Sequence, residues 1–398
     1  MKKLKKRIWI ANLILGGVIL CLLSYLTLIN GITKENLESD RNSTIVDLTT
    51  PFPTTPLDEN IMPTTTVEPT QSVLVESTET PSPTKESKSD IQLVFTGDVL
   101  LHNTTLSAYA RGGLDQMVEK KLTDKMIAAD ITMVNQEFAF SDGGTPMKNK
   151  KYTFRSSPKN VSILNEMGID IVSLANNHTL DYGEEALLDS FETLDAAKIK
   201  YVGAGKNLEE AKKIEYFDVK GSRIAFVASS RVIPNVGWNA TKSKPGMLTT
   251  YDPTATLKVI EEAKANADFV VIYVHWGVEY AKSPEAYQKN MARQYIDAGA
   301  DAVVGSHTHC LQGIEYYKEK PIIYSLGNFA FNKTIEQTAL LEMNIRTDGS
   351  IDLSLYPCEA KNGRTTMITE KQRVDAFNEY MESISFGIKF QEGQKITW

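Results

Sequence analysis

The sequence predicts an α/β domain of short buried strands that alternate with helices, preceded by one membrane-spanning segment and a polar spacer. Two observations predict the domain: near-continuous apolar runs from residue 91 onward, and amphipathic stretches between them. A third, the uneven composition of the first ninety residues, predicts the segments that precede it. The chain has 398 residues, but this unevenness means that the usual scale of about 150 residues per domain does not apply to its whole length.

The first 29 residues have the charge pattern of a membrane anchor. Residues 1–7 are rich in Lys and Arg, and residues 8–29 are uncharged and almost entirely apolar. At about 1.5 Å per residue, such a run spans a hydrocarbon core of about 30 Å. The positive-inside rule predicts that residues 1–7 form a cytoplasmic tail and that the chain after residue 29 is extracytoplasmic.

We expect residues 8–29 to remain as an uncleaved signal-anchor, so that the protein is a single-pass protein of the cell membrane. The run exceeds the usual h-region of about 7–15 residues, and no A-x-A-like cleavage site follows it. A cleaved signal peptide is the alternative, because its basic and apolar regions look similar.

Residues 30–90 are predicted to form a disordered spacer. They are rich in Thr, Pro and Ser, with dense segments at 49–56 and 78–84. Such a composition cannot bury enough apolar area to offset the conformational entropy of the chain. The spacer would hold the folded domain, residues 91–398, away from the bilayer.

The strands of this domain are predicted at apolar runs that are continuous rather than alternating, as is typical of strands buried on both faces. The last two runs, together with the helix at Glu370–Ser383, indicate that residues 332–398 complete the same domain. The predicted strands are Ile91–Thr96, Ile131–Asn135, Ile169–Ala175, Arg223–Ser229, Phe269–His275, Ala302–Ser306, Ile322–Leu326, Ala339–Asn344 and Ile351–Tyr356.

Amphipathic stretches between these strands predict helices. Apolar residues recur in them at spacings of three and four, which places them on one helix face. The predicted helices are Glu184–Ile199, Thr256–Ala267 and Pro284–Ala298.

Side chains with metal-binding or acid–base chemistry follow directly after several predicted strands. In open α/β sheets, the ligand crevice lies beyond the carboxyl ends of the strands, so one crevice could collect all of these side chains. Carboxylates and imidazoles together are the ligands that Zn, Mn or Fe prefer. The candidates in this position are Asp98, Glu137, Asn177, His178, His275, His307 and His309.

The pair His307 and His309 is the sharpest local signal for a metal site. A spacing of two in extended backbone would point both rings to one side, where they could share an ion. Two histidines on a solvated loop are the alternative, which the turn residues Gly305 and Ser306 before them make less favourable.

Two further residues have two interpretations each, and a third is a candidate for the same site. Asp181 could orient the ring of His178, or it could cap the helix that begins near residue 182, and the sequence favours neither role. Arg155 could bind a carboxylate or phosphate of the substrate, or it could be a surface arginine on a loop. His102 lies close after Asp98 in the chain and could take part in the same site.

The motifs in this order resemble the CapA/PgsA family of poly-gamma-glutamate capsule synthesis proteins. The resemblance covers roughly residues 92–331 and is more specific than any one motif. The segments that carry it are Phe95–Asp98, Asn135–Glu137, Ser173–His178 with Asp181–Gly183, Val274–Tyr280, Gly305–His309 with Gln312, and Tyr324–Phe329.

This family is in turn similar to the calcineurin-like metallophosphoesterases, which implies a two-sheet sandwich flanked by helices. The resemblance implies His178 as a general acid near the leaving group. The sequence departs from the phosphoesterase pattern at Leu100, where a histidine is common, and at Asn176, where glycine is usual. The metal ligands that the resemblance implies are Asp98, Glu137 (in the place of the usual bridging aspartate), Asn177, His275, His307 and His309.

The implied function is the synthesis or export of an anionic cell-envelope polymer, poly-gamma-glutamate, with a metal-dependent hydrolase-like site that holds one or two Mn, Fe or Zn ions. A non-catalytic, polymer-binding subunit of a membrane synthesis and export assembly is the alternative. A third interpretation is a surface protein that contacts polysaccharide. The net charge of −7 and the lack of a long basic stripe argue against nucleic acid as a partner.

Overall fold

The computed structural model describes residues 88–398. The predictions for the cytoplasmic tail, the signal-anchor at 8–29 and nearly all of the spacer lie outside the described residues. Across residues 88–398, none of the helices has both the length and the apolar composition that a membrane crossing requires.

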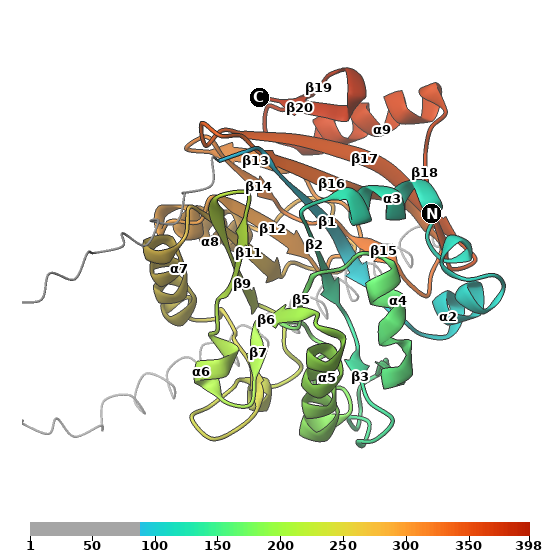
Figure 1. Cartoon of the computed structure of the whole chain (residues 1–398), viewed down its shortest axis with the longest axis vertical. Helices are drawn as coiled ribbons and strands as arrows, with labels where there is room; N and C mark the ends of the chain where they lie inside the picture. The colour runs from blue at the N-terminus through green and yellow to red at the C-terminus, as the bar shows by residue number, and fades with distance from the viewer. Residues whose placement is uncertain (1–87) are drawn as a thin grey trace, which may run out of the picture. The chain divides into compact units, whose positions relative to one another are not determined.

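The described chain contains a mixed ten-stranded sheet and a second, six-stranded sheet (Figure 1). In the first sheet, β1 (Ile91–Val99) pairs in parallel with β2 (Ile131–Gln136) and antiparallel to β16 (Ile335–Ile345). The order β19-β20-β17-β16-β1-β2-β5-β6 is completed by β15 beside β1 and β18 beside β17. The remaining strands are β5 (Ile171–Ser173), β6 (Lys200–Val202), β15 (Asn328–Ala330), β17 (Ile351–Lys361), β18 (Arg364–Met367), β19 (Lys389–Phe390) and β20 (Lys395–Thr397).

The second sheet has the order β13-β14-β12-β11-β9-β8. Its centre is parallel, because β11 (Phe269–His275) pairs in parallel with both β9 (Ser222–Ser230) and β12 (Ala302–Ser306). Its edges are antiparallel hairpins formed by β8 (Glu215–Val219) with β9 and by β13 (Ile314–Tyr317) with β14 (Lys320–Ile323). Four two-residue strands form two small additional sheets: β3 (Ala139–Phe140), β4 (Arg155–Ser156), β7 (Ala204–Gly205) and β10 (Gly246–Met247).

The two large sheets pack face to face. Alternate side chains of each strand enter a shared core, in which Phe95 and Met133 of the first sheet lie with Phe226 and Tyr273 of the second. The intervening side chains point to the outer faces, which helices cover. Because both faces of the central strands are buried, their sequences are continuously apolar.

The helices complete a four-layer arrangement, helix–sheet–sheet–helix (Figure 1). Those on the first sheet are α2 (Asn103–Ala110), α3 (Lys120–Ala128), α4 (Val161–Glu166) and α5 (Gly183–Ala197), and those on the second are α7 (Thr254–Asn266) and α8 (Ala286–Asp297). Helix α9 (Lys371–Ile384) adds Phe377 and Met381 to the core between the sheets. The short α6 (Leu208–Ala211) and the 3-10 turns Leu114–Gln116, Pro158–Asn160, Val236–Trp238 and Glu392–Gln394 lie in connections.

The prediction of an α/β domain with two packed sheets is therefore confirmed, with local differences. The predicted bounds of β11 and β12 agree with the structure. The predicted strand at Ile322–Leu326 was displaced, because β14 (Lys320–Ile323) begins two residues earlier and ends three residues earlier. After Ile323 the chain crosses toward β1. There the carbonyl of Gly327, a residue with a positive φ of 64°, accepts a hydrogen bond from the backbone N–H of Asp98.

Candidate metal centre

The carboxyl ends of parallel strands from both sheets converge on one cluster of polar side chains. Asp98 is the penultimate residue of β1, and Glu137 directly follows β2 in the same sheet. From the second sheet, His275 ends β11 and His307 directly follows β12. The sandwich thus brings together residues that lie up to about 200 positions apart in the sequence.

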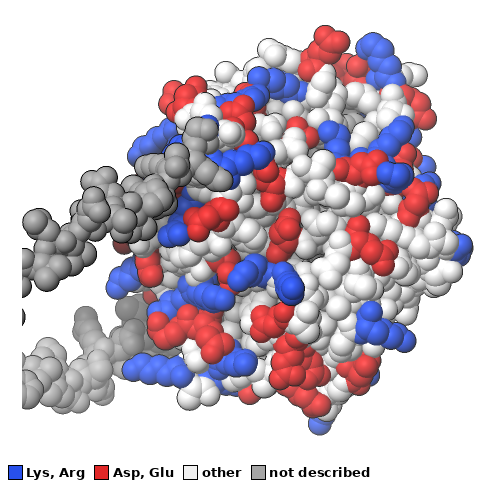
Figure 2. Space-filling view, in the orientation of Figure 1, with Lys and Arg blue, Asp and Glu red and all other residues white. Residues whose placement is uncertain are grey.

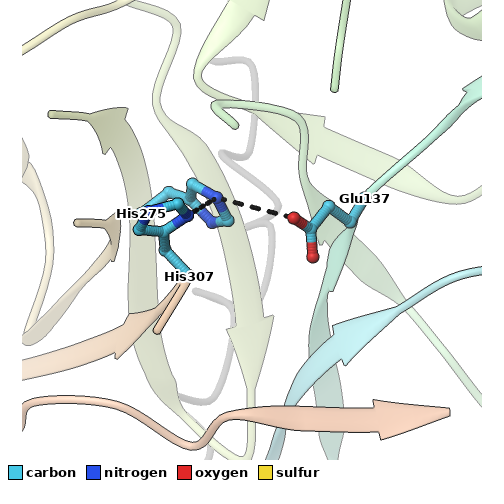
Figure 3. A group of neighbouring side chains, drawn as sticks. All are labelled: Glu137, His275 and His307. Atoms are coloured by element: carbon cyan, nitrogen blue, oxygen red, sulfur yellow. Dashed lines mark hydrogen bonds and ion pairs between the residues drawn. The ribbon is translucent and has the colours of Figure 1, made fainter. Parts of the chain in front are cut away.

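The side chains form two overlapping groups of possible metal ligands. Within each group, the ligand atoms all lie within 4.8 Å of one another. One consists of Glu137, His275 and His307, and the other of Asp98, Glu137 and His309. Figure 3 shows the His275 and His307 rings together on one side, facing the Glu137 carboxylate on the other. Glu137 belongs to both groups and therefore lies at the centre of the cluster, which we call the carboxylate–histidine cluster.

The polar atoms of this cluster fit a cation. Both carboxylate oxygens of Glu137 are buried and have no hydrogen-bond partner among the described residues. Buried carboxylates without hydrogen bonds are costly and rare, so each such group calls for a specific explanation. A divalent ion at this point would satisfy both oxygens.

Burial shifts the pKa values of the carboxylate and the imidazoles in this cluster in the direction that favours their neutral forms. Burial, and then the nearby Asp98, hold the pKa of Glu137 well above its usual range. Burial lowers the pKa of His307 to about 3, and burial followed by the neighbouring histidines lowers that of His275 well below its usual range. The imidazoles of His275 and His307 are thus neutral at pH 7 and keep a lone pair for a metal ion.

Asp98 is held in place by a close approach of two backbone segments. A side chain at Gly97 would place its Cβ 1.7 Å from the carbonyl oxygen of Gly327, so only glycine fits there. This approach lets the Asp98 N–H donate to the same carbonyl at 2.8 Å. The Asn135 amide donates to Asp98 Oδ1 at 2.9 Å and so fixes the carboxylate.

The expected extended backbone at His307 and His309 was wrong. The two residues have φ values of 92° and 57°, in the left-handed region that non-glycine residues rarely adopt. Gly305 and Ser306 do not form a turn but are the last residues of β12. The two rings nevertheless lie with centroids 6.0 Å apart, because the chain turns sharply rather than continuing as a strand. Such strain is typical of functional sites, where surrounding contacts enforce it.

Amide and hydroxyl side chains contact the imidazoles of the cluster and orient them. Asn177 Oδ1 lies 2.8 Å from His275 Nε2, which places this predicted ligand against the cluster. Asn328 Oδ1 lies 2.7 Å from His309 Nδ1, and Ser306 Oγ lies 3.0 Å from His275 Nδ1. Sequence reasoning did not assign a role to Asn328, although it lies within the quoted motif Tyr324–Phe329.

His178 lies at the rim of the cluster and is oriented by Asp181. Its Nδ1 is 2.6 Å from Asp181 Oδ2, and its Nε2 is 3.8 Å from Glu137 Oε1. Asp181 does not cap the following helix, since the N-cap of α5 is Tyr182 and has no side-chain cap bond. The structure therefore favours the orienting role of Asp181 over the capping role.

Lys150 also belongs to this rim, and sequence reasoning missed it. Its ammonium group donates to Asp181 and to the Asn177 carbonyl, and it lies 3.2 Å from His178 Nδ1. Burial lowers the pKa of Lys150 below its usual range, although Asp181 acts in the opposite direction. The residue comes from the connection between β3 and β4, where nothing in the apolar pattern marks it.

Neither His102 nor Arg155 joins the cluster. His102 Nδ1 lies 2.9 Å from the Asn332 amide nitrogen, and its ring is 5.6 Å from that of Phe154. Arg155 donates to the Gly143 carbonyl and stacks over the Tyr182 ring at 4.5 Å. The remaining cysteines of the described chain, Cys310 and Cys358, are both free thiols.

Comparison with known proteins identifies relatives over most of the chain. The family model for the bacterial capsule synthesis protein PGA_cap matches residues 92–333. The capsule biosynthesis protein CapA of Bacillus anthracis is 32% identical over 314 residues, covering 75% of this chain and 76% of that protein. The PGA biosynthesis protein CapA of Bacillus subtilis is 31% identical over 332 residues, covering 80% and 85%.

Among solved structures, the likeness is weaker. The sulfate thiohydrolase SoxB of Thermus thermophilus has a TM-score of 0.41 at 14% identity, over 74% of this chain and 60% of that chain. The 5'-nucleotidase of Candida albicans has a TM-score of 0.38 at 13% identity, over 68% and 52%. These TM-scores and identities are too low to assign a fold or a function to this chain by comparison. The fold is therefore defined by its strand pairing and packing.

Proposed function

This chain belongs to the family of bacterial capsule synthesis proteins, and from that premise we propose that it acts in the synthesis or export of an anionic capsule polymer of the poly-gamma-glutamate type. We further propose that it does so through a divalent-metal site at the carboxylate–histidine cluster. One observation carries the second step: the buried Glu137 carboxylate, without hydrogen bonds, faces two neutral imidazoles. Family membership alone would not support a reaction, because function depends on the site and not on the fold.

The residues that would hold the metal are Asp98, Glu137, His275, His307 and His309, with Asn177 beside them. A divalent ion in such a site supplies Lewis acidity and lowers the pKa of bound water. Mn, Fe and Zn suit this mixture of carboxylate and imidazole ligands.

His178 is suited to move a proton at the edge of this site. Asp181 accepts from Nδ1 and thereby leaves Nε2 facing the cluster, near Glu137. This arrangement fixes one tautomer and aims one nitrogen at the position of a leaving group. Burial lowers the pKa of His178, whereas the hydrogen bond to Asp181 acts to raise it. We therefore propose hydrolysis of a phosphoester-like or related bond in the polymer or its precursor.

A non-catalytic, polymer-binding role is the second candidate, and one observation favours it. Leu100, in the place where related phosphoesterases carry a histidine, is fully buried in the apolar core outside the first sheet. His102 does not replace it, because its ring contacts Asn332 and Phe154 instead. The cluster thus has one ligand fewer on the Asp98 side than a site with that histidine would have, which suits a single ion better than a pair. A single ion can bind an anionic polymer without the two-metal arrangement of many phosphoesterases.

Metal analysis combined with a turnover assay tests the proposal. The purified protein should contain about one or two equivalents of divalent metal and should hydrolyse a generic phosphodiester. The variant Glu137→Gln should lose metal, whereas the matched surface variant Glu261→Gln, at an exposed position of α7, should retain it. Bound metal without turnover would support the polymer-binding role, and absence of metal from the protein with intact Glu137 would refute the metal site.

A further inference from the structure

A cavity of about 230 Å³ lies directly beside the carboxylate–histidine cluster, and nothing above assigns it a role. His309 of the cluster and Asn328, which contacts His309, form part of its wall. Tyr280 and Lys282, from the connection after β11, line another part, and Lys333 lies in the connection between β15 and β16. Below the 300 Å³ typical of sites for drug-sized ligands, the volume suits one small unit of a chain.

Two lysines make this cavity attractive to an anion. Neither Lys282 nor Lys333 lies within ion-pair distance of a carboxylate anywhere in residues 88–398, although many other lysines of this region do. Among the residues that line the cavity, the two lysines exceed the one carboxylate, Glu336, by one charge, and Glu279 lies near Lys333 outside the lining. An unpaired ammonium group beside a cavity is free to bind a ligand without first breaking an ion pair.

Contacts around Tyr280 connect Lys333 to the cluster. The Lys333 ammonium donates to the Tyr280 hydroxyl at 2.7 Å, and the Tyr280 ring lies 5.8 Å from the His309 ring. On the other side, Lys282 lies 5.7 Å from the centre of the Tyr380 ring of α9. The Lys333 ammonium is thus one side chain away from His309, a residue of the cluster.

Charge on the face of the molecule in Figure 2 is not concentrated in one patch. On the face of the molecule in Figure 2, acidic and basic side chains are intermixed, and no broad patch of one sign is visible there. A general positive field on that face therefore does not attract a polyanion, and recognition depends on individual contacts.

We propose that this cavity is the subsite that binds a carboxylate-bearing unit of the anionic polymer adjacent to the unit at the cluster, with Lys282 and Lys333 as its cationic contacts. The proposal rests on the proposed function for the class of polymer. Lysine ammonium groups alone do not distinguish carboxylate from phosphate, because they act as point charges. The experiment therefore includes both kinds of polyanion.

Cys310 provides a readout of binding that does not depend on activity. It lines the same cavity and is half-buried, whereas Cys358 is fully buried. Alkylation of the full-length protein, followed by mass spectrometry of each cysteine-containing peptide, gives the rate at Cys310 with and without polymer. The ratio of these rates serves as the reference for each variant, so a change in thiol reactivity itself does not affect the comparison.

Poly-gamma-glutamate should slow alkylation of Cys310, and polyphosphate of matched charge should do so at a similar concentration, because the two lysines act as point charges. In the double variant Lys282→Gln/Lys333→Gln, the polymer concentration for half-protection should rise about two- to thirtyfold, as for the loss of two exposed ion pairs. The matched variant Lys121→Gln, at an exposed lysine of α3 outside the cavity, should behave as the unmodified protein. Metal content should be unchanged in all three proteins.

Equal protection of the double variant and the unmodified protein, or absence of protection, would overturn the subsite. Stronger protection by polyphosphate than by poly-gamma-glutamate would overturn the assignment of the bound unit as carboxylate-bearing. Failure of the proposed function would give a different result. Protection would still depend on the two lysines, but the protein would bind no metal and would show no turnover. Since both lysines are exposed, neither substitution should affect folding, and a charge reversal, Lys282→Glu, should weaken protection further.

Discussion

The substitution Glu137→Gln should have opposite effects on the stability of the metal-free and the metal-bound protein. In the metal-free protein, two buried carboxylates lie close together, with ligand oxygens of Asp98 and Glu137 no more than 4.8 Å apart. Removal of one charge relieves this repulsion. In the metal-loaded protein, the same change removes a ligand.

The magnitude follows from this distance. At an effective dielectric constant of about 20, two full charges at this separation repel by about 3 kcal/mol. The raised pKa of both groups means that part of this repulsion is already avoided by protonation. The new amide would also lack hydrogen-bond partners, which offsets another part. We therefore expect a net gain of about 1–2 kcal/mol for the metal-free variant at pH 7–8.

The same pKa shifts predict how the stability of the metal-free protein depends on pH. A carboxyl group with a folded-state pKa above its unfolded value contributes stability below the unfolded value of about 4, and this contribution is lost as the pH rises through the folded-state pKa. Because burial raises the pKa of both Asp98 and Glu137, the metal-free protein should become less stable from about pH 4 upward. The loss should be smaller in Glu137→Gln, which has only one of the two groups.

Urea unfolding followed by tryptophan fluorescence measures these differences, since Trp276 is fully buried beside the second sheet. Each protein is unfolded with a chelator and again with divalent metal. At a metal concentration about 100 times the dissociation constant, binding should stabilise the unmodified protein by about 2.7 kcal/mol. A tenfold or greater loss of affinity in the variant should reduce this stabilisation by about 1.4 kcal/mol or more.

The surface variant Glu261→Gln controls for removal of a negative charge elsewhere, and both of its unfolding curves should match those of the unmodified protein. A contrary result would be that Glu137→Gln is less stable than the unmodified protein without metal and is stabilised by metal to the same extent. That result would mean that Glu137 has a structural role within the core and is not a ligand.

Three further predictions concern other parts of the chain. His178→Ala should retain its metal and lose turnover by about 10²–10⁴-fold, measured by elemental analysis beside a phosphodiester assay; loss of metal would contradict the assigned role. Gly97→Ala should destabilise the protein by about 3 kcal/mol or more in urea unfolding, because its Cβ would overlap the Gly327 carbonyl; an unchanged midpoint would contradict the close approach. If residues 8–29 form the predicted anchor, protease added to intact cells should remove the domain, whereas release of a mature form beginning near residue 33 would show cleavage.

Much of the second sheet could be predicted from the sequence. Phe269–His275 and Ala302–Ser306 are buried on both faces, so nearly every residue of these strands is apolar and their ends stand out against the polar residues that follow. Short edge strands such as β13 and β18 were not predicted, because they are partly exposed and their composition follows neighbouring strands rather than any strong local preference.

Candidate site residues could be predicted because parallel strands present their ends to a common edge. Asp98, Glu137, His275 and His307 each follow or end a buried run, so their positions could be inferred one strand at a time. Lys150 could not be inferred in this way. It lies in an irregular connection, and its contact with Asp181 depends on how that connection folds back over the sheet.

The alternation of strands and helices and the kinds of side chain at the strand ends can be read from the local sequence, because burial on both faces leaves a pattern of apolar residues. The orienting role of Asp181 toward His178, and the left-handed backbone of His307 and His309, become evident only in the folded chain. Such features depend on contacts between segments far apart in the chain, as at Gly97 and Gly327. The energies of these contacts exceed the weak local preferences that a sequence pattern records.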